Sequence, residues 1–260
     1  MTAPAEQLVS LVAPGSVEAD QYRGLRHTIE KMHRANGLQM LAVTSPGPGD
    51  GKSVTTLNLA GALAQSADTR VLVIDADLHR PSVGKYLGFE GPYAPGLVDA
   101  IRDDSCGLEQ VARRLDRVNL SVVLSGVCES GAYELLNSAR LERLLKDARS
   151  RFDYVLVDTP PLLPLPDCRL IGQWVDGFMI LVAANRTPRR ALGEALNLLD
   201  PGKVLGLVFN GDDRPFSRYS SYYGYYGYYG YKADTTPSSS RGWFERLRSS
   251  RRDNHRFRPH

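Results

Sequence analysis

The sequence predicts an α/β fold with a mainly parallel central sheet flanked by helices on both faces. Two observations predict it. Short, fully apolar runs alternate with segments of helical periodicity from residue 40 to residue 209, as expected for buried parallel strands. The first apolar run also leads into a glycine-rich loop, PGPGDGKS at residues 46–53, that opens a helix. Together they indicate the P-loop NTPase-like form of this fold.

The chain starts with a segment that carries no structural periodicity. Residues 1–15 contain two prolines, so we expect a flexible arm there. A helix is predicted from Asp20 to about residue 35, and Asn36-Gly37 ends it. One apolar stripe supports this helix, formed by Tyr22, Leu25, Ile29 and Met32.

The body of the chain alternates strands and helices. Six strands are predicted, at residues 40–45, 71–75, 119–124, 154–158, 178–183 and 204–209. Helices are predicted at residues 53–65, 133–149, 167–174 and 189–199. These elements form one domain, which we place at residues 16–212.

The composition changes after Asn210. Residues 213–260 are dominated by Gly, Tyr, Ser and Arg, and no segment there could build a core, so we expect a disordered tail. It contains a tyrosine cluster at residues 219–231. Seven arginines in residues 241–260 suit anionic lipid headgroups, tail phosphates or a merely solubilising terminus.

Composition narrows the function and the location. A formal net charge of +3 is too small to argue for nucleic acid. The three cysteines form no CxxC spacing, so neither a zinc site nor a disulfide framework is indicated, which fits a reducing cytoplasm. The first ten residues lack the basic region and apolar core of a signal peptide, and no apolar run approaches the ~20 residues of a membrane span, so a cytoplasmic protein is expected.

The glycine-rich loop predicts a phosphate-binding site. Its glycines let successive backbone N–H groups turn inward, and the following helix directs its positive end to the same point. Lys52 would reach the β- and γ-phosphates and the Ser53 hydroxyl would ligate Mg²⁺. Pro46 stands where the general pattern has glycine. The predicted nucleotide-binding residues are Gly47, Gly49, Asp50, Gly51, Lys52, Ser53, Val54 and Asn210.

Two buried strands end in aspartates. VLVIDAD places Asp75 and Asp77 at the end of one strand, and YVLVD places Asp158 at the end of another. A carboxylate in such a position is costly unless a charge compensates it, and in P-loop folds that charge is Mg²⁺ with its waters. The alternative is that these aspartates only cap helices or turns.

These motifs together resemble the bacterial tyrosine kinases of capsule and exopolysaccharide synthesis. The resemblance runs from about Val17 to Tyr231 and covers the P-loop, VLVIDADLHRP at 71–81, YVLVDTPP at 154–161, Asp167 and the tyrosine cluster. It implies an ATP-dependent protein tyrosine autokinase in which Lys52 and Ser53 bind phosphate and metal. Asp75 and Asp158 would hold Mg²⁺ through water, Asp77 would accept the tyrosine proton, and Asn210 would read adenine.

The resemblance also extends to the N-terminal helix. It is similar to a Glu-x-x-Arg-x-x-Arg element that joins subunits of the family into a ring, read here as Asp20, Arg23 and Arg26. Asp20 is one methylene shorter than glutamate, and a solvated helix face is the alternative reading of these charges. His79 stands where the family usually has arginine.

The tyrosine cluster is the expected phosphoacceptor. Eight of the thirteen tyrosines fall within it: Tyr219, Tyr222, Tyr223, Tyr225, Tyr226, Tyr228, Tyr229 and Tyr231. A phenol with a pKa near 10 needs a carboxylate to take its proton. An adhesive low-complexity segment is the alternative reading.

Three functions fit the sequence. The first is the autokinase, which the resemblance implies to act in exopolysaccharide or capsule synthesis or export. That role includes a separate membrane-bound adaptor of the polysaccharide co-polymerase type, a cognate tyrosine phosphatase and a place at the inner membrane face. The second is a partition or positioning ATPase, although those proteins usually carry a lysine early in the P-loop and have no tyrosine tail. The third is a nucleotide-binding interaction protein that has lost kinase activity.

Overall fold

A seven-stranded sheet forms the centre of the molecule. The computed structural model describes residues 2–115 and 118–211. The strand order is β3-β4-β2-β5-β1-β6-β7, and every neighbouring pair is parallel except the antiparallel pair β3–β4. The strands are Met40–Thr44 (β1), Val71–Asp75 (β2), Ala112–Arg114 (β3), Leu120–Val123 (β4), Tyr154–Asp158 (β5), Gly177–Ala183 (β6) and Val204–Asn210 (β7). The predicted fold class and the six predicted strands are confirmed.

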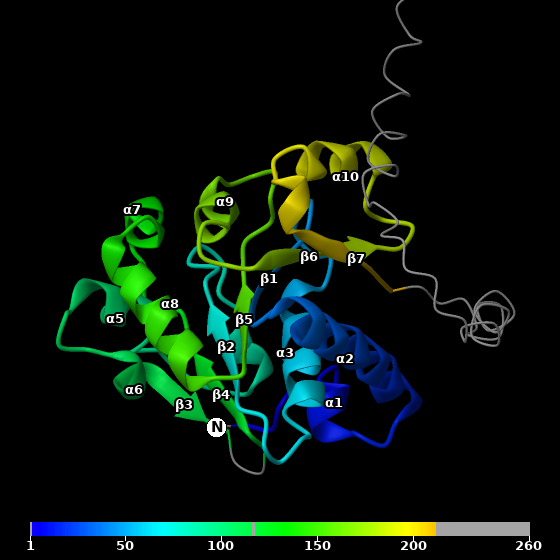
Figure 1. Ribbon diagram of the computed structural model, residues 1–260. Coiled ribbons are helices and arrows are strands. Elements are labelled where there is room, and N and C mark those ends of the chain that lie inside the picture. The colour runs from blue at the N-terminus through cyan, green and yellow to red at the C-terminus, as the bar shows by residue number, and fades with distance from the viewer. Residues whose placement is uncertain (1, 116–117, 212–260) are drawn as a thin grey trace, which may run out of the picture. The chain divides into compact units, whose positions relative to one another are not determined.

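Helices cover both faces of the sheet (Figure 1). On one face lie Val9–Val12 (α1), Val17–Asn36 (α2) and Lys52–Leu63 (α3), and α3 contacts β1, β2 and β5 directly. The other face carries Leu97–Arg102 (α5), Leu108–Val111 (α6), Ala132–Leu136 (α7) and Ala139–Arg151 (α8). The remaining helices are Val83–Tyr86 (α4), Asp167–Ile171 (α9), Arg189–Leu196 (α10) and the 3₁₀ turn Pro201–Lys203.

The central strands are apolar throughout because both of their faces are covered. Every residue of β1, β2, β5 and β6 is buried, so alternating polar positions would have been costly. In the register of β2 and β5, Asp75 lies opposite Asp158. The parallel arrangement therefore brings these two carboxylates together at the edge where the strands end.

Helix α2 follows the predicted helix closely. It starts three residues earlier than expected because the side chain of Ser16 accepts a hydrogen bond from the backbone N–H of Ala19. It ends at Gly37, which takes the left-handed conformation with a φ of 70°.

Residues 2–13 differ from the flexible arm expected at 1–15. Leu8 is fully buried, and α1 packs on α3. Asn58 of α3 holds the segment from inside the fold: it accepts from the backbone N–H of Ser10 at 2.9 Å and donates to the carbonyl of Gln7 at 2.8 Å. A buried amide with two backbone partners orders a segment that lacks periodicity of its own.

Some local predictions were wrong. The helix expected at residues 133–149 is two helices, because Ser138 caps the second one by accepting from the N–H of Leu141. The edge strand β3 was not predicted, since it has three residues and two of them are arginines. The short helices α4, α5 and α6 were missed as well, because one turn gives no measurable periodicity.

The tyrosine cluster and the arginine-rich end of the chain lie outside the described residues. None of the helices in the two described ranges is both long enough and apolar enough to cross a membrane.

Candidate functional site

The P-loop joins β1 to α3 and has the geometry of an anion cradle. Gly49 and Gly51 have φ values of 83° and 93°, which only glycine adopts without strain. Gly51 is the N-cap of α3, so the helix opens at the loop and directs its free N–H groups toward it. This arrangement suits a phosphate group.

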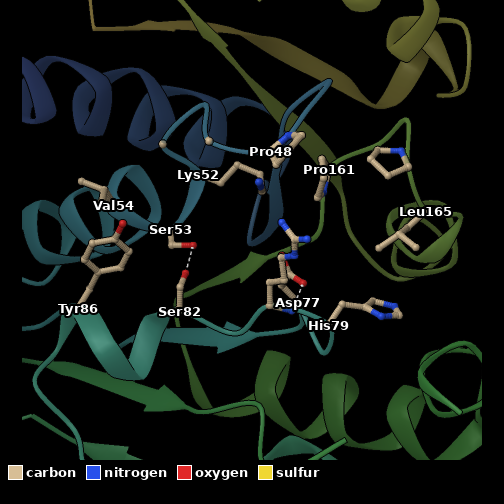
Figure 2. Close-up of a pocket in the computed structure, with 14 residues that line it drawn as sticks. Pro48, Lys52, Ser53, Val54, Asp77, His79, Ser82, Tyr86, Pro161 and Leu165 are labelled. Atoms are coloured by element: carbon tan, nitrogen blue, oxygen red, sulfur yellow. Dashed lines mark hydrogen bonds between the residues drawn. The ribbon is translucent and has the colours of Figure 1, made fainter. Parts of the chain in front are cut away.

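Lys52 and Ser53 open helix α3 beside the loop. Lys52 is buried although it is charged. The Ser53 hydroxyl donates to Oδ2 of Asp158 at 2.5 Å and accepts from the hydroxyl of Ser82 at 2.7 Å. Figure 2 shows the bond between the two serines and the lysine side chain extending past the loop. Ser82 was not predicted, because a serine after a strand has no distinctive pattern.

Two of the predicted carboxylates lie beneath the cavity and are almost completely buried. Asp158 accepts from Ser53 and from Thr56, the latter at 3.4 Å. Asp75 accepts from the backbone N–H groups of Ser82 and Val83 at 3.2 and 3.1 Å. Burial raises the pKa of Asp158 to about 7. Burial and the neighbouring charge of Asp158 raise the pKa of Asp75 well above its usual value. A cation bound beside them would stabilise the ionised form of both carboxylates.

Asp77 differs from the other two because it reaches the cavity. It is 9% exposed, whereas Asp75 and Asp158 are each 1% exposed. Its Oδ1 accepts from the backbone N–H of Arg80 at 3.0 Å. In Figure 2 the side chain of Asp77 faces the same space as Lys52 and Ser53.

The cavity has a volume of about 540 Å³, which is enough for a nucleotide. It extends between Tyr86 on one side and Leu165 on the other (Figure 2). The predicted residues that line it are Gly49, Gly51, Lys52, Ser53, Val54 and Asp77. The lining residues that were not predicted as nucleotide-binding or catalytic residues are Pro48, Arg80, Ser82, Tyr86, Pro161, Pro164 and Leu165, together with His79, which the sequence analysis singled out only by its resemblance position. Most belong to loops, where composition says little about position.

The outer side of the P-loop is held by residues far along the chain. The hydroxyl of Thr187 donates to Oδ1 of Asp50 at 2.9 Å, and the side-chain amide of Asn210 donates to the carbonyl of Asp50 at 3.0 Å. Asp50 is buried, and its Oδ2 has no hydrogen-bond partner among the described residues. The side chains of Asp50 and Asn210 thus brace the loop, and neither these residues nor Gly47 line the cavity.

His79 bridges the segment after β2 to the start of α9. Its Nε2 lies 2.7 Å from Oδ2 of Asp167, a buried carboxylate. His79 lines the cavity next to Arg80. The histidine therefore has a defined partner in the position where the resembling family usually carries arginine.

The three residues expected to join subunits lie on one helix, and their contacts are within the chain. Arg23 pairs with Asp20 and donates to the carbonyl of Pro14 at 2.5 Å. Arg26 pairs with Glu30 at 2.6 Å and donates to the carbonyl of Ala62 at 2.9 Å. Asp20 and Arg23 are exposed, whereas Arg26 is half-buried between α2 and α3.

The site fits a nucleotide with a divalent cation. Two left-handed glycines and a helix N-terminus would receive phosphate oxygens, and Lys52 adds a positive charge. The Ser53 hydroxyl and the carboxylates of Asp75 and Asp158 are hard oxygen donors, the type that Mg²⁺ prefers. In the part of the chain that the structure describes, no group of three His, Cys, Asp or Glu residues forms a metal site by itself. A bound polyphosphate would add further oxygen donors to this set.

Comparisons with known proteins agree with this reading. Residues 38–171 match the AAA domain family. The chain is 32% identical over 206 residues to tyrosine-protein kinase YwqD of Bacillus subtilis, covering 78% of this chain and 85% of the relative. It is 31% identical over 222 residues to succinoglycan biosynthesis transport protein ExoP of Rhizobium meliloti, covering 82% of this chain and 27% of that protein. The matched region therefore makes up most of YwqD but only about a quarter of the longer ExoP.

The fold matches solved structures as well. The BceF tyrosine kinase domain superposes with a TM-score of 0.69 at 27% identity, covering 81% of this chain and 91% of that domain. The kinase domain of the Escherichia coli tyrosine kinase ETK gives a TM-score of 0.74 over 83% of this chain and 84% of that one. Its 23% identity establishes a shared fold alone.

Proposed function

The chain belongs to the bacterial tyrosine-protein kinases of the AAA domain family, and we propose that it transfers the γ-phosphate of ATP to its own tyrosine cluster at residues 219–231. The observation that carries this proposal is the convergence of Lys52, Ser53 and Asp77 on one cavity above two buried carboxylates. A phosphate cradle alone serves hydrolysis equally well. A carboxylate at the cavity wall adds a group that can take a proton from an incoming hydroxyl.

Each residue has a distinct role in the proposed transfer. Gly49, Gly51 and Lys52 bind the phosphate chain and stabilise the charge that develops on it. Ser53 would ligate Mg²⁺ through its hydroxyl, and Asp75 and Asp158 would hold the ion through water. When bound, the cation neutralises negative charge on the phosphoryl group in transfer.

Asp77 is the proposed base. Asp75 and Asp158 are 1% exposed and accept hydrogen bonds from Ser53, Thr56 or the backbone, so a substrate hydroxyl has little access to them. Asp77 lines the cavity and uses only its Oδ1 for the backbone of Arg80. A tyrosine with a pKa near 10 is neutral at pH 7, so its attack on phosphorus needs such an acceptor.

The cellular role is proposed from the relatives. ExoP is named for succinoglycan biosynthesis and transport, and it is longer than this chain. We propose that this chain acts in exopolysaccharide or capsule synthesis or export and is recruited to the inner face of the membrane by a separate adaptor of the polysaccharide co-polymerase type. A cognate tyrosine phosphatase would reverse its modification.

The tyrosine cluster gives the enzyme a charge switch. Each phosphate adds about −1.5 to −2 charges, so eight add roughly −12 to −16. That exceeds the formal net charge of +3 several-fold, and neighbouring phosphorylated tails would repel one another. A lightly modified tail then permits assembly and a heavily modified one disperses it. Phosphorylation that leaves the salt dependence of assembly unchanged would exclude this switch.

Mass spectrometry tests the proposed reaction. Purified full-length protein is incubated with Mg²⁺ and ATP, with and without the cytoplasmic segment of a candidate adaptor, and the modified residues are mapped. Phosphotyrosine within residues 219–231 is expected. Lys52→Met should abolish it because the phosphate chain loses its cation.

Asp77→Asn separates transfer from nucleotide binding. The amide keeps the shape of the side chain and cannot take the proton, so phosphotyrosine should fall about 100-fold or more while nucleotide affinity changes little. Asp68→Asn, at an exposed position outside the cavity, is the control and should match the wild type. Free phosphate without phosphotyrosine would identify a partition-type ATPase instead. If neither phosphotyrosine nor free phosphate forms, the chain is instead a nucleotide-binding interaction protein.

A further inference from the structure

The turn between β6 and α10 carries an arginine that none of the roles above uses. Nη2 of Arg186 lies 3.3 Å from the position that a Cβ would take on Gly49, so the guanidinium rests against the P-loop. The residue is exposed. Within residues 2–115 and 118–211 no hydrogen bond or ion pair engages its side chain, although most arginines near the core have one. Its charge is thus available beside the phosphate cradle.

The turn that presents Arg186 is fixed to the loop. The hydroxyl of Thr187 donates to Asp50 of the P-loop and accepts from the backbone N–H of Ala183, both at 2.9 Å. The N–H groups of Arg186 and Thr187 both donate to the carbonyl of Ala183. Asn185 takes a left-handed φ of 60° within this turn. The backbone of Arg186 is therefore positioned before any ligand arrives.

The charge balance of the site calls for a further cation. Asp50, Asp75, Asp77 and Asp158 are buried around the loop. Arg80 lines the cavity from the segment after β2, and Lys52 is the only lysine or arginine buried among the described residues. Oδ2 of Asp50 has no partner there, so its charge is only half satisfied. A nucleotide adds several negative charges at the same place. Positive groups fixed close to that charge stabilise it strongly in a partly buried site.

We propose that Arg186 is a phosphate-binding residue of the nucleotide site, whose guanidinium bonds to oxygens of the nucleotide's phosphate chain from the flank of Gly49. The inference rests on the nucleotide site of the proposed function. Guanidinium suits this position because its planar fork matches two phosphate oxygens and it stays charged at any working pH. Thr187 acts through it as a positioning residue, because its bond to Asp50 fixes the turn.

Calorimetric binding of nucleotides to the full-length protein tests this assignment without depending on catalysis. The probes are the non-hydrolysable ATP analogue AMP-PNP with Mg²⁺, ADP with Mg²⁺, and adenosine. Arg186→Gln should weaken AMP-PNP binding about tenfold or more, which is the typical effect of losing one charge-assisted contact. Adenosine binding should stay unchanged, and Arg186→Lys should recover part of the loss.

Arg189→Gln provides the matched control. Arg189 is exposed at the first position of α10, three residues beyond Arg186, and its loss should leave affinity unchanged. The proposal is wrong if Arg186→Gln binds AMP-PNP like the wild type, if adenosine affinity falls equally, or if Arg189→Gln gives the same loss. A wild-type protein that binds AMP-PNP through Arg186 and never forms phosphotyrosine would overturn the kinase proposal alone. A wild type that binds no nucleotide would overturn both.

Discussion

Gly51 shows how one missing side chain shapes the site. Its φ is 93°, and an added Cβ would lie 2.1 Å from Nδ2 of Asn210. Gly51→Ala should therefore lower the free energy of unfolding by about 1–2 kcal/mol, from backbone strain together with displacement of Asn210. Urea denaturation of the nucleotide-free protein measures this loss. Gly47→Ala, where an added Cβ meets nothing within 4 Å, should change stability by less than about 0.5 kcal/mol.

A double mutant separates the two causes of that loss. Asn210→Ala removes the atom that the new methyl group meets and leaves the backbone strain in place. The double variant Gly51→Ala with Asn210→Ala should then lose less stability than the sum of the single losses. Strict additivity would mean that the side chain of Asn210 does not fill this space.

The raised pKa of Asp158 predicts how the stability of the nucleotide-free protein depends on pH. Burial raises its pKa in the folded protein to about 7, whereas an unfolded aspartate titrates near 3.9. The folded state thus binds the proton more tightly, so stability is gained as pH falls from about 7 toward 4 and lost as pH rises through 7.

Asp158→Asn removes this buried charge. At pH 8 the variant should be more stable than the wild type by about 2 kcal/mol, and the difference should shrink toward pH 5. Denaturation curves at several pH values measure the difference directly. A constant difference from pH 5 to pH 8 would show that Asp158 does not titrate in this range. Tyrosine phosphorylation should be lost at every pH.

The sequence could predict the core of the site for a physical reason. Gly49, Gly51, Lys52 and Ser53 must follow one another in the chain, because a nest and a helix start are local structures. Asp75 and Asp158 were placed because both end strands of a parallel sheet. Thr187, Ser82 and Arg186 could not be predicted as site residues. Each contacts the P-loop from a turn far along the chain, and no spacing in the sequence indicates such a contact.

At the scale of elements, the packing of helix α1 can be tested through the burial of Leu8. Leu8, at its N-cap, is fully buried beneath α3 although it belongs to a segment with no periodicity. Leu8→Ala should lower the free energy of unfolding by about 2–4 kcal/mol, from lost burial and the cavity that remains. The matched control is Val12→Ala, at a position 44% exposed at the end of the same helix, with an expected change below about 0.5 kcal/mol. Equal losses in the two variants would contradict the packing of this segment.

The same segment explains which elements the sequence could predict. Strands of the central sheet were found because burial on both faces leaves a continuous apolar run, as in Tyr154–Asp158. Helix α1 is held in place by Asn58, a residue about fifty positions away in the sequence. The residues of α1 alone therefore could not predict that this segment is ordered. Likewise β3 is paired on one side only, and its arginines carry no strand pattern.

At the scale of the whole molecule, we propose that copies of the chain assemble through helix α2. Asp20 and Arg23 are exposed and paired with each other, so they can exchange partners with a second copy. Arg26 is held by Glu30 and Ala62 within its own chain. We expect Arg23→Glu to convert the assembly into monomers in sedimentation velocity runs.

Arg34→Glu, at an exposed position near the other end of α2, should leave the assembly of the wild type intact. If Arg23→Glu sediments like the wild type, these charges only solvate the helix. Both variants should unfold at the wild-type urea concentration, since surface changes away from the core cost little.

The hydrogen bonds at the amino end have a mechanical consequence. The N–H of Thr2 donates to the carbonyl of Gly88, and the N–H of Ala5 donates to the carbonyl of Tyr86, whose side chain lines the cavity. Any polypeptide fused ahead of Thr2 would leave the domain at this wall. We therefore expect an affinity tag at that end to act on the cavity through these two backbone bonds, and to change the measured nucleotide affinity relative to the untagged protein.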